Sequence, residues 1–269
     1  MFTKSQIYNQ LKQMNAPQDK PVIVHVSLRA VGEVEGRAQG LLDVLVEYFT
    51  EKGGLLVVPT HTWANFYELK KKITLDLNDN ATCIGTFPSI ALEDGRAVRT
   101  LNPTHSVAVF GERSKVEQFI ENEDKVQTPT SPDGVYGKLF NMDGYALLIG
   151  VGHNKNTILH CVEEILDIPN RLSNDFAEMF IKLKDGSLIK RECRYMKAEG
   201  TDDVSQFFPK YEPAFRLHGA ISDGFIGNAK TQLCSVNVMK EVMALVAKNS
   251  CGKELLTDNA PLDRCWFEK

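Results

Sequence analysis

The sequence predicts a mixed α/β (α+β) fold, in which a central mixed sheet is flanked by helices and the C-terminal part carries a β-hairpin. Up to about residue 175, short apolar runs rich in β-branched residues alternate with segments of helical periodicity. Beyond that point, apolar and polar residues alternate on both sides of an Asp-Gly turn. The chain of 269 residues can bury a full core. Because no linker or repeat interrupts it, we expect a single domain over residues 1–269.

The first elements follow from the spacing of apolar residues. Ile7, Leu11 and Met14 recur at helical intervals and predict a helix over residues 5–14. The compact apolar run VIVHV (residues 22–26) predicts a buried strand directly after a proline. GLLDVLVEYFTEKGG (residues 40–54) predicts a helix that ends at its two glycines, and LLVVP (residues 55–59) predicts the next buried strand.

The later elements follow in the same way. Two more strands are predicted at Val107–Gly111 and Tyr145–Val151, each leading into a helical pattern. The segment FAEMFIKLKDGSLIKRECRYM (residues 176–196) predicts a hairpin that turns at Asp185 and Gly186. Residues 61–104 show no regular pattern. Because structureless stretches of that length are usually lids or binding loops, we expect a functional loop region there.

Composition excludes several classes of protein. No apolar run approaches the roughly 20 residues that span a bilayer, and the N-terminus has no apolar signal core, so we expect a cytoplasmic protein without a membrane role. The net charge of −4 and the pI near 5.9 argue against a nucleic-acid partner, which would require a basic face. The six cysteines form no CxxC pair, so we expect reduced thiols and no zinc knuckle. Mild acidity is compatible with a cationic substrate.

The stretch GVGHNKNTILHCVEEIL, residues 150–166, combines a helix start with polar side chains. Asn154, Asn156 or Thr157 could cap this helix. His160 lies three residues before Glu163 and four before Glu164, so the three share one side of the helix. A neighbouring carboxylate fixes the tautomer of a histidine and stabilises its charged form, as a general base requires. The alternative is an exposed polar pair without a function.

Cys161 adjoins the histidine in sequence. On a helix it points about 100° away from His160, so we expect a small core residue and not a nucleophile.

Three other segments share features with this one. HVSLRAVG (residues 25–32) follows the first predicted strand, PTHTW (residues 59–63) follows the second, and NPTHS (residues 102–106) precedes the third. In α/β folds the carboxyl ends of sheet strands open a ligand crevice. We therefore expect hydroxyls, histidines and free backbone amides to meet at one rim.

Taken together and in this order, these segments resemble the aminoglycoside 3-N-acetyltransferase family. The resemblance lies in five blocks: HVS with AVG (residues 25–27 and 30–32), GGLLVVPT (53–60), RTLNPTHSVA (99–108), YGKL (136–139), and GVG with NTILHCVEE (150–152 and 156–164). It implies an antibiotic N-acetyltransferase-like fold, distinct from that of the GNAT acetyltransferases. It also implies acetyl-coenzyme A as co-substrate, no metal, and acetylation of the 3-amino group of 2-deoxystreptamine aminoglycosides. The oligomeric state stays open, with a homodimer among the alternatives.

The resemblance further implies roles for individual residues. His160 matches the catalytic general base, and Asp202 is the best match for the acidic residue that supports it, with Asp203 and Glu163 as alternatives. Contacts to coenzyme A are implied for His25, Val26, Ser27, Leu28, Arg29, Ala30 and Val31, and for Thr104, His105, Ser106 and Val107. Contacts to the cationic acceptor are expected from Glu163, Glu164, Asp203, Thr62 and Trp63.

These residue types suit the chemistry of acetyl transfer. An ammonium group must lose a proton before it can attack a thioester, and histidine titrates near neutral pH. The developing oxyanion needs a donor such as a backbone amide or the hydroxyl of Thr104 or Ser106. No covalent acyl-enzyme is required if both substrates are held together.

Other interpretations stay open. One is an acetyltransferase of the same fold that acts on a different amine, such as an amino sugar or a phosphonate metabolite. Another is a coenzyme A-binding protein without catalysis. A metal site built from His105, His153 and His160 is disfavoured, because no HxH or HxxxH spacing occurs among them.

Overall fold

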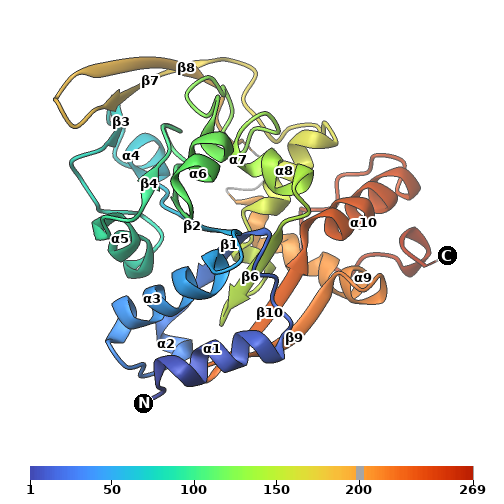
Figure 1. Ribbon diagram of the computed structural model, residues 1–269. Helices are drawn as coiled ribbons and strands as arrows, with labels where there is room; N and C mark the ends of the chain where they lie inside the picture. The colour runs from blue at the N-terminus through green and yellow to red at the C-terminus, as the bar shows by residue number, and fades with distance from the viewer. Residues whose placement is uncertain (198–202, 269) are drawn as a thin grey trace.

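The structure is a computed structural model that describes residues 1–197 and 203–268. A seven-stranded mixed sheet forms the centre of the protein (Figure 1). The strand order is β4-β5-β2-β1-β6-β10-β9. At the centre, β1 (Pro21–Val26) pairs in parallel with β2 (Leu55–Pro59) and with β6 (Tyr145–Ile149). Towards the edges, β5 (Val107–Phe110), β4 (Val98–Arg99), β10 (Ala229–Ser235) and β9 (Ile221–Ile226) are added by antiparallel pairing. The predicted central mixed sheet is confirmed.

One face of the sheet is covered by α1 (Lys4–Gln13), α3 (Arg37–Thr50) and α5 (Thr86–Glu93). Because successive strand residues point to opposite faces, Val22 and Val24 of β1 meet Leu11, Leu45 and Phe87 on this side. The short helix α2 (Leu28–Val31) follows β1 directly. The predicted helix over residues 5–14 and the predicted strands VIVHV and LLVVP are confirmed.

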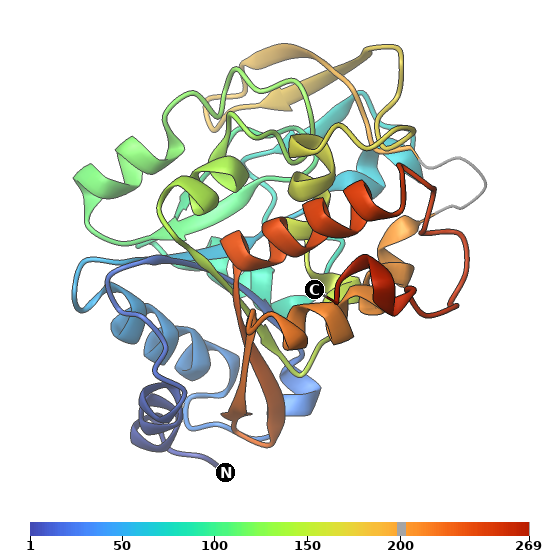
Figure 2. The ribbon, with the colours of Figure 1, turned by 90° about the vertical axis from the view of Figure 1, so that its right-hand side faces the viewer.

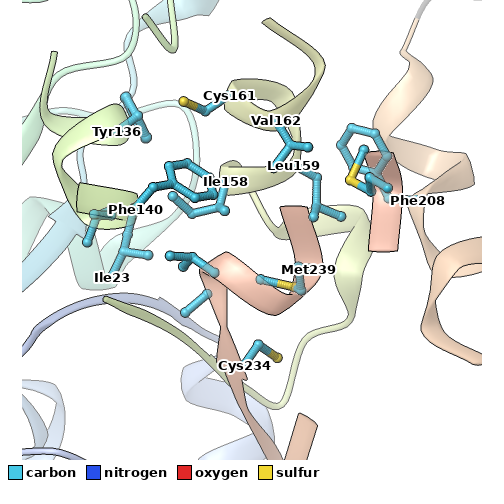
Figure 3. Close-up of a cluster of buried hydrophobic side chains, with 14 of the residues drawn as sticks. Ile23, Tyr136, Phe140, Ile158, Leu159, Cys161, Val162, Phe208, Cys234 and Met239 are labelled. Atoms are coloured by element: carbon cyan, nitrogen blue, oxygen red, sulfur yellow. The ribbon is translucent and has the colours of Figure 1, made fainter. Parts of the chain in front are cut away.

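The opposite face is covered by α6 (Arg113–Ile120), α7 (Val135–Asn141), α8 (Ile158–Ile165), η2 (Val204–Tyr211), α9 (Glu212–Leu217) and α10 (Val236–Asn249). Figure 3 shows Ile158 and Leu159 of α8 packed between α7 and Met239 of α10. Cys161 lies in the same core near Tyr136, so its predicted place in the core is confirmed. Two short 3-10 turns, η1 (His153–Lys155) and η3 (Arg264–Trp266), complete the elements.

A second, three-stranded sheet lies at one edge of the molecule, at the top of Figure 1. It contains β3 (Ile73–Asp76), β7 (Ala177–Lys182) and β8 (Leu188–Cys193). The antiparallel pair β7–β8 turns at Gly186, which adopts a positive φ of 87° that suits glycine. The predicted hairpin is therefore confirmed, and β3 adds to it in parallel.

The prediction of a structureless region between residues 61 and 104 is wrong. This segment contains α4 (Trp63–Tyr67), β3, α5 and β4. These elements are short, and distant partners hold them in place: Arg99 Nη1 donates to the Asp79 carbonyl at 2.9 Å, and β3 pairs with β7 more than a hundred residues away. A local sequence pattern does not show such contacts.

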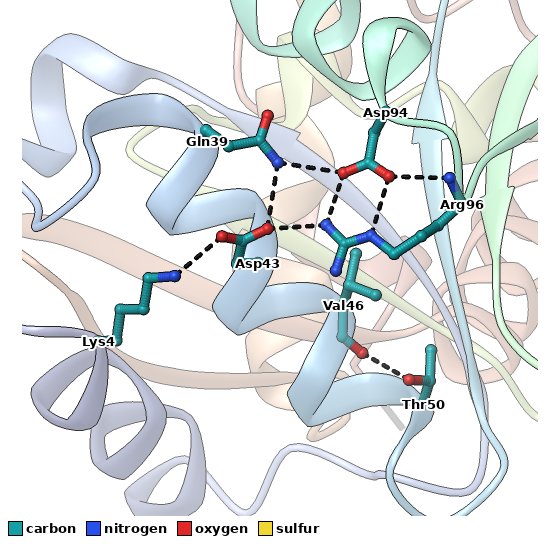
Figure 4. A network of polar contacts seen from close by, with 7 residues as sticks. All are labelled: Lys4, Gln39, Asp43, Val46, Thr50, Asp94 and Arg96. Carbon is teal, nitrogen blue, oxygen red and sulfur yellow. Dashed lines mark hydrogen bonds and ion pairs between the residues drawn. The ribbon is translucent and has the colours of Figure 1, made fainter.

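A polar network joins α1, α3 and the turn after α5 (Figure 4). The Asp43 carboxylate accepts hydrogen bonds from Lys4 Nζ at 2.9 Å and from Arg96 Nη2 at 2.7 Å. Arg96 also donates to Asp94, through Nε at 2.8 Å and Nη2 at 2.5 Å. The network fixes the layer of helices beneath the sheet. In the part of the chain that the structure describes, no helix has the length and apolar character to cross a membrane.

Candidate active site

A cavity of ≈ 670 Å³ opens at the carboxyl ends of β1 and β2 and beside the end of β6. The connection from β1 to β2 passes over the face covered by α3, whereas the chain after β6 continues into α8 on the other face. Neighbouring parallel strands thus send their connections in opposite directions, which leaves a crevice between them. His25 and Ser27 line it from β1 and the following residue, His61 from the end of β2, and His160 from α8.

His160 occupies the first turn of α8, with its ring against the edge of Phe208 at a centroid distance of 4.8 Å. Its Nδ1 lies 3.2 Å from Oε2 of Glu163, which is only 2% exposed. Since an ionised carboxylate only accepts, Nδ1 carries the hydrogen and the Nε2 lone pair is free. Among residues 1–197 and 203–268, Nε2 has no hydrogen-bond partner, while the side chain is 16% exposed. The geometry is that of a general base.

Glu163 has a second partner that the sequence analysis missed. Its Oε1 accepts a hydrogen bond from Nε of Arg171, whose side chain is 8% exposed. Arg171 in turn forms a bidentate pair with Glu254, through Nη1 at 2.6 Å and Nη2 at 2.9 Å. The sequence offers only an indirect signal for this partner: a carboxylate that is buried requires a positive charge nearby. Nothing in the sequence indicates which cation provides it.

Glu164 does not line this cavity and instead anchors a loop. Its Oε1 accepts from the backbone N–H of Thr130 at 3.1 Å and from the Thr130 hydroxyl at 2.6 Å, and its Oε2 accepts from the Thr128 hydroxyl at 2.5 Å. Burial raises the pKa of this carboxyl. The carboxylates of Glu163 and Glu164 are thus both occupied by protein donors. Their predicted contacts with substrate ammonium groups stay a prediction.

His61, Tyr136 and His105 form a buried network on the wall of the cavity. The Tyr136 hydroxyl donates to the carbonyl of His105 at 3.0 Å and lies 3.0 Å from Nε2 of His61. Because that hydroxyl has one hydrogen, it accepts from His61, whose Nε2 therefore carries the hydrogen. The two imidazole rings stack at a tilt with centroids 4.5 Å apart. The tautomer of His61 is thus fixed by the protein.

Three of the cavity's imidazoles are uncharged at neutral pH. Burial lowers the pKa of His25 to about 4 and that of His105 to about 3, and it lowers the pKa of His61 well below the usual value. Nε2 of His25 is buried without a partner in the described chain, as is Oδ1 of Asn156, which also lines the cavity. Both residues line the cavity, and each carries a buried polar atom that no described group satisfies.

An aromatic wall closes another side of the cavity. Trp63 and Tyr67 of α4 lie in edge contact, with centroids 6.4 Å apart, and Phe87 of α5 lines the cavity beside them. The carboxylates that line the cavity within the described ranges are Glu68 and Asp203. The sequence analysis named Trp63 and Asp203 but missed Tyr67, Glu68 and Phe87. Their place depends on how α4 and α5 fold back over the sheet.

Several predicted site residues do not line this cavity. Leu28 and Val31 face a separate groove beside α3, and Arg29 and Ala30 lie between them in α2. Thr62 donates to the carbonyl of Pro103 at 3.3 Å.

The segment Thr104–Val107 contributes only His105 to the cavity. Thr104 Oγ1 pairs with His105 Nδ1 at 2.9 Å, the Ser106 hydroxyl donates to the Thr60 carbonyl at 3.0 Å, and Val107 is buried in β5. Both hydroxyls thus have protein partners, and their predicted role as oxyanion donors stays a prediction.

The acidic pair after the second sheet is only partly described. Asp202 lies outside the described residues. Asp203 lines the mouth of the cavity, and its Oδ1 accepts from the N–H of Ser205 at 2.9 Å at the start of η2. The carboxylate that contacts His160 in the described chain is Glu163.

Residues 1–197 and 203–268 contain no group of three or more His, Cys, Asp or Glu side chains arranged to hold a metal ion. His153, which entered the alternative metal site, is fully buried against Phe215 at a centroid distance of 5.1 Å. Its Nδ1 lies 3.2 Å from Nδ2 of Asn156, which gives it a packing role.

Comparisons with known proteins identify the family to which this chain belongs. The family model for aminoglycoside 3-N-acetyltransferases matches residues 23–247. The chain is 23% identical to the SPbeta prophage-derived aminoglycoside N(3')-acetyltransferase-like protein YokD of Bacillus subtilis (strain 168), over 87% of this chain and 88% of that protein. It is 25% identical to an aminoglycoside N(3)-acetyltransferase IV from Salmonella sp, over 70% of this chain and 67% of the relative.

Solved structures show the same fold. Aminoglycoside acetyltransferase AAC(3)-IVa in complex with apramycin superposes with a TM-score of 0.73 at 20% identity, over 94% of this chain and 95% of that chain. The structure named AAC-IIIb binary with CoASH superposes with a TM-score of 0.75 at 17% identity, over 90% and 94% of the two chains. With the family model covering most of the sequence and the fold matching its solved structures, the chain belongs to the aminoglycoside 3-N-acetyltransferase family.

Proposed function

We propose that the protein transfers the acetyl group of acetyl-coenzyme A to the 3-amino group of a 2-deoxystreptamine aminoglycoside, with His160 as general base. The observation that carries the proposal is the state of the His160 ring. Its Nδ1–H is held by the buried carboxylate of Glu163, and its Nε2 has no hydrogen-bond partner among the described residues, while the side chain lines the cavity of ≈ 670 Å³. Family membership supports the substrate class.

His160 would act on the acceptor amine as it attacks. The Nε2 lone pair removes a proton from the nitrogen, and the resulting imidazolium is stabilised by Glu163 on the other side of the ring. The protonated ring can then return a proton to the departing thiolate of coenzyme A. Both substrates are held together, so an acyl-enzyme is unnecessary. The buried Cys161 thiol, whose pKa burial raises well above its usual value, has no part in the reaction.

The residues of the cavity fit the pantetheine arm of coenzyme A, which carries two amide groups. Asn156 Oδ1 can accept from an amide N–H, and Nε2 of His25 is a second unpaired buried atom on the same cavity. We keep His25, Val26 and Ser27 in the proposed coenzyme A site for this reason. The adjoining residues up to Val31 stay in the proposal through their resemblance to the family pattern.

A second candidate is the same reaction on a different amine. One observation favours it. The described carboxylates that line the cavity are Glu68 and Asp203, whereas Trp63, Tyr67 and Phe87 form an aromatic wall. An acceptor with fewer ammonium groups and an apolar face would suit that wall.

The test follows coenzyme A release with a thiol reagent, for purified protein given acetyl-coenzyme A and a panel of 2-deoxystreptamine aminoglycosides, amino sugars and aromatic amines. We expect amine-dependent release that His160→Gln lowers about 1,000-fold. His218→Gln is the matched control, because His218 contacts the Phe267 carbonyl far from the cavity. Calorimetry measures coenzyme A binding in each variant. Wild-type turnover in His160→Gln would refute the role of His160, and release with other amines alone would select the second candidate.

A further inference from the structure

We propose that Arg171 is a positioning residue: it holds Glu163 in place, and Glu163 in turn holds His160 in the orientation that catalysis needs. Glu254 partly neutralises Arg171 and so limits the electrostatic effect of the guanidinium on the imidazole. The inference rests on the proposed function only in assigning His160 as the base. In the described chain, the guanidinium of Arg171 bonds to Glu163, Glu254 and the carbonyl of Pro169. It therefore acts on the histidine through Glu163.

The four side chains form a line of alternating charge. Glu254 pairs with Arg171, Arg171 pairs with Glu163, and Glu163 holds His160. Glu163 and Arg171 are 2% and 8% exposed, so each charge depends on its neighbour for compensation. When His160 gains a proton, the line becomes neutral as a whole. The network therefore stabilises the protonated imidazole without an excess of buried negative charge.

The arginine is required for its shape as well as its charge. Nε donates to one carboxylate while Nη1 and Nη2 donate to the other, at 2.6 and 2.9 Å. A lysine has one compact ammonium group and cannot bridge two carboxylates in this way. Although burial opposes it, the pKa of Arg171 is raised by Glu254 and Glu163. The guanidinium stays charged at any pH at which the protein is folded.

Glu254 is the accessible end of the line. It lies in the segment after α10, drawn in red in Figure 2, and its side chain is 37% exposed. The backbone N–H of Leu256 also donates to it, at 2.8 Å. Burial alone would raise its pKa, but Arg171 lowers it. Replacing Glu254 removes part of the charge compensation of Arg171 without opening a hole in the core.

Other titratable groups face the same place and stay unchanged in the experiment. Among the described residues, those near the His160–Glu163–Arg171 line are His61, His105, Glu164, Lys197, Asp203 and Tyr211. Because each contributes to the field at the imidazole, the measurement must be a difference between variants.

The first measurement is the NMR titration of His160 in protein with labelled histidine, assigned among the six histidines with His160→Gln. Glu254→Gln leaves the charge of Arg171 less compensated. We therefore expect the titration midpoint of His160 to fall by about 0.5 pH unit. The midpoint of the acidic limb of the pH profile of kcat/KM should fall by the same amount. Asp223→Asn is the matched control, because Asp223 binds Arg216 in the same bidentate way, at 2.7 and 3.0 Å, on the α9–β9 side of the molecule.

The second measurement is the steady-state kinetics of Arg171→Lys. This variant keeps the positive charge but loses the planar group that donates to both carboxylates at once. We expect kcat to fall about tenfold with KM for acetyl-coenzyme A unchanged, since the base is misoriented while the cavity is intact. Arg216→Lys, the same change in an arginine that also bridges two carboxylates, should leave kcat unchanged. Thermal unfolding of both variants separates a loss of stability from a loss of positioning.

Two results would overturn the proposal. One is a His160 midpoint in Glu254→Gln that moves no more than in Asp223→Asn, and the other is a wild-type kcat in Arg171→Lys. The proposed function fails separately. If the midpoint moves as expected while no amine is acetylated, the positioning network stands and the transferase assignment falls.

Discussion

Glu123 offers a test of how burial controls the stability of this fold. It follows α6 and is 2% exposed, with Oε2 accepting from the N–H of Val135 at 2.8 Å and Oε1 from Nδ2 of Asn102 at 3.5 Å. Among the described residues it has no cation in salt-bridge contact. Burial raises its pKa from 4.5 to about 7. The perturbation is Glu123→Gln, which keeps the shape and removes the ionisation.

The sign follows from proton binding. The folded protein binds the Glu123 proton more tightly than the unfolded chain does, so its contribution is fully present below pH 4.5 and is lost as pH rises through about 7. A difference of about 2.5 pH units between the two states corresponds to about 3 kcal/mol at 1.36 kcal/mol per unit. Glutamine can still accept from Val135, and only the long contact with Asn102 is lost. We expect Glu123→Gln to match the wild type at pH 5 within about 1 kcal/mol and to exceed it by about 2 kcal/mol at pH 8.

The assay is urea unfolding of both proteins at pH 5 and pH 8, monitored by circular dichroism. Glu121→Gln serves as control, because this exposed carboxylate lies two residues away and should change neither value. A difference between Glu123→Gln and wild type that is the same at both pH values would refute the reasoning. It would mean that Glu123 is ionised in the folded protein at pH 5.

Three further predictions follow from the contacts described above. Glu163→Gln should lower kcat at least 100-fold with unchanged coenzyme A affinity, because the amide no longer fixes the tautomer of the base; steady-state kinetics and calorimetry test it. Tyr136→Phe removes the hydroxyl shared by His61 and His105, so urea unfolding should show a loss of about 1–2 kcal/mol. Arg96 lowers the pKa of Asp94 to about 2, so the stability from this pair is present above pH 3.8 and lost as pH falls through 2. Thermal unfolding of Asp94→Asn should show a Tm about 2 °C lower at pH 6 but equal to wild type at pH 2.

The parts of the fold that the sequence predicts are those with a strong local signal. LLVVP reads as a strand because β2 is covered on both faces and can be apolar throughout. The β7–β8 hairpin is visible because Asp185-Gly186 supports a tight turn. By contrast, β3 has four residues and pairs with β7 more than a hundred residues away, and β4 has only two residues. No local pattern could have separated them from a loop.

The candidate site divides in the same way. The i,i+3 spacing of His160 and Glu163 predicts their contact, because a helix brings these positions together. The partners of the two glutamates come from other segments: Arg171 beyond the end of α8, and Thr128 and Thr130 more than thirty residues before Glu164. The sequence therefore indicated acidic residues near His160 but not that other parts of the protein bind both of them.

The C-terminal segment matters more to the centre of the molecule than the extent of the family match suggests. The family model ends at residue 247, while Glu254, which completes the Arg171 pair, lies beyond that boundary. In the same segment, the Leu255 carbonyl accepts a hydrogen bond from Lys210 Nζ, and the Phe267 carbonyl contacts His218 Nε2. A fragment trimmed to the family boundary would keep every residue of the proposed coenzyme A cavity. It would nevertheless leave the buried guanidinium of Arg171 half-paired next to Glu163 and His160, so fragments and C-terminal fusions should keep residues 250–268 as part of the working enzyme.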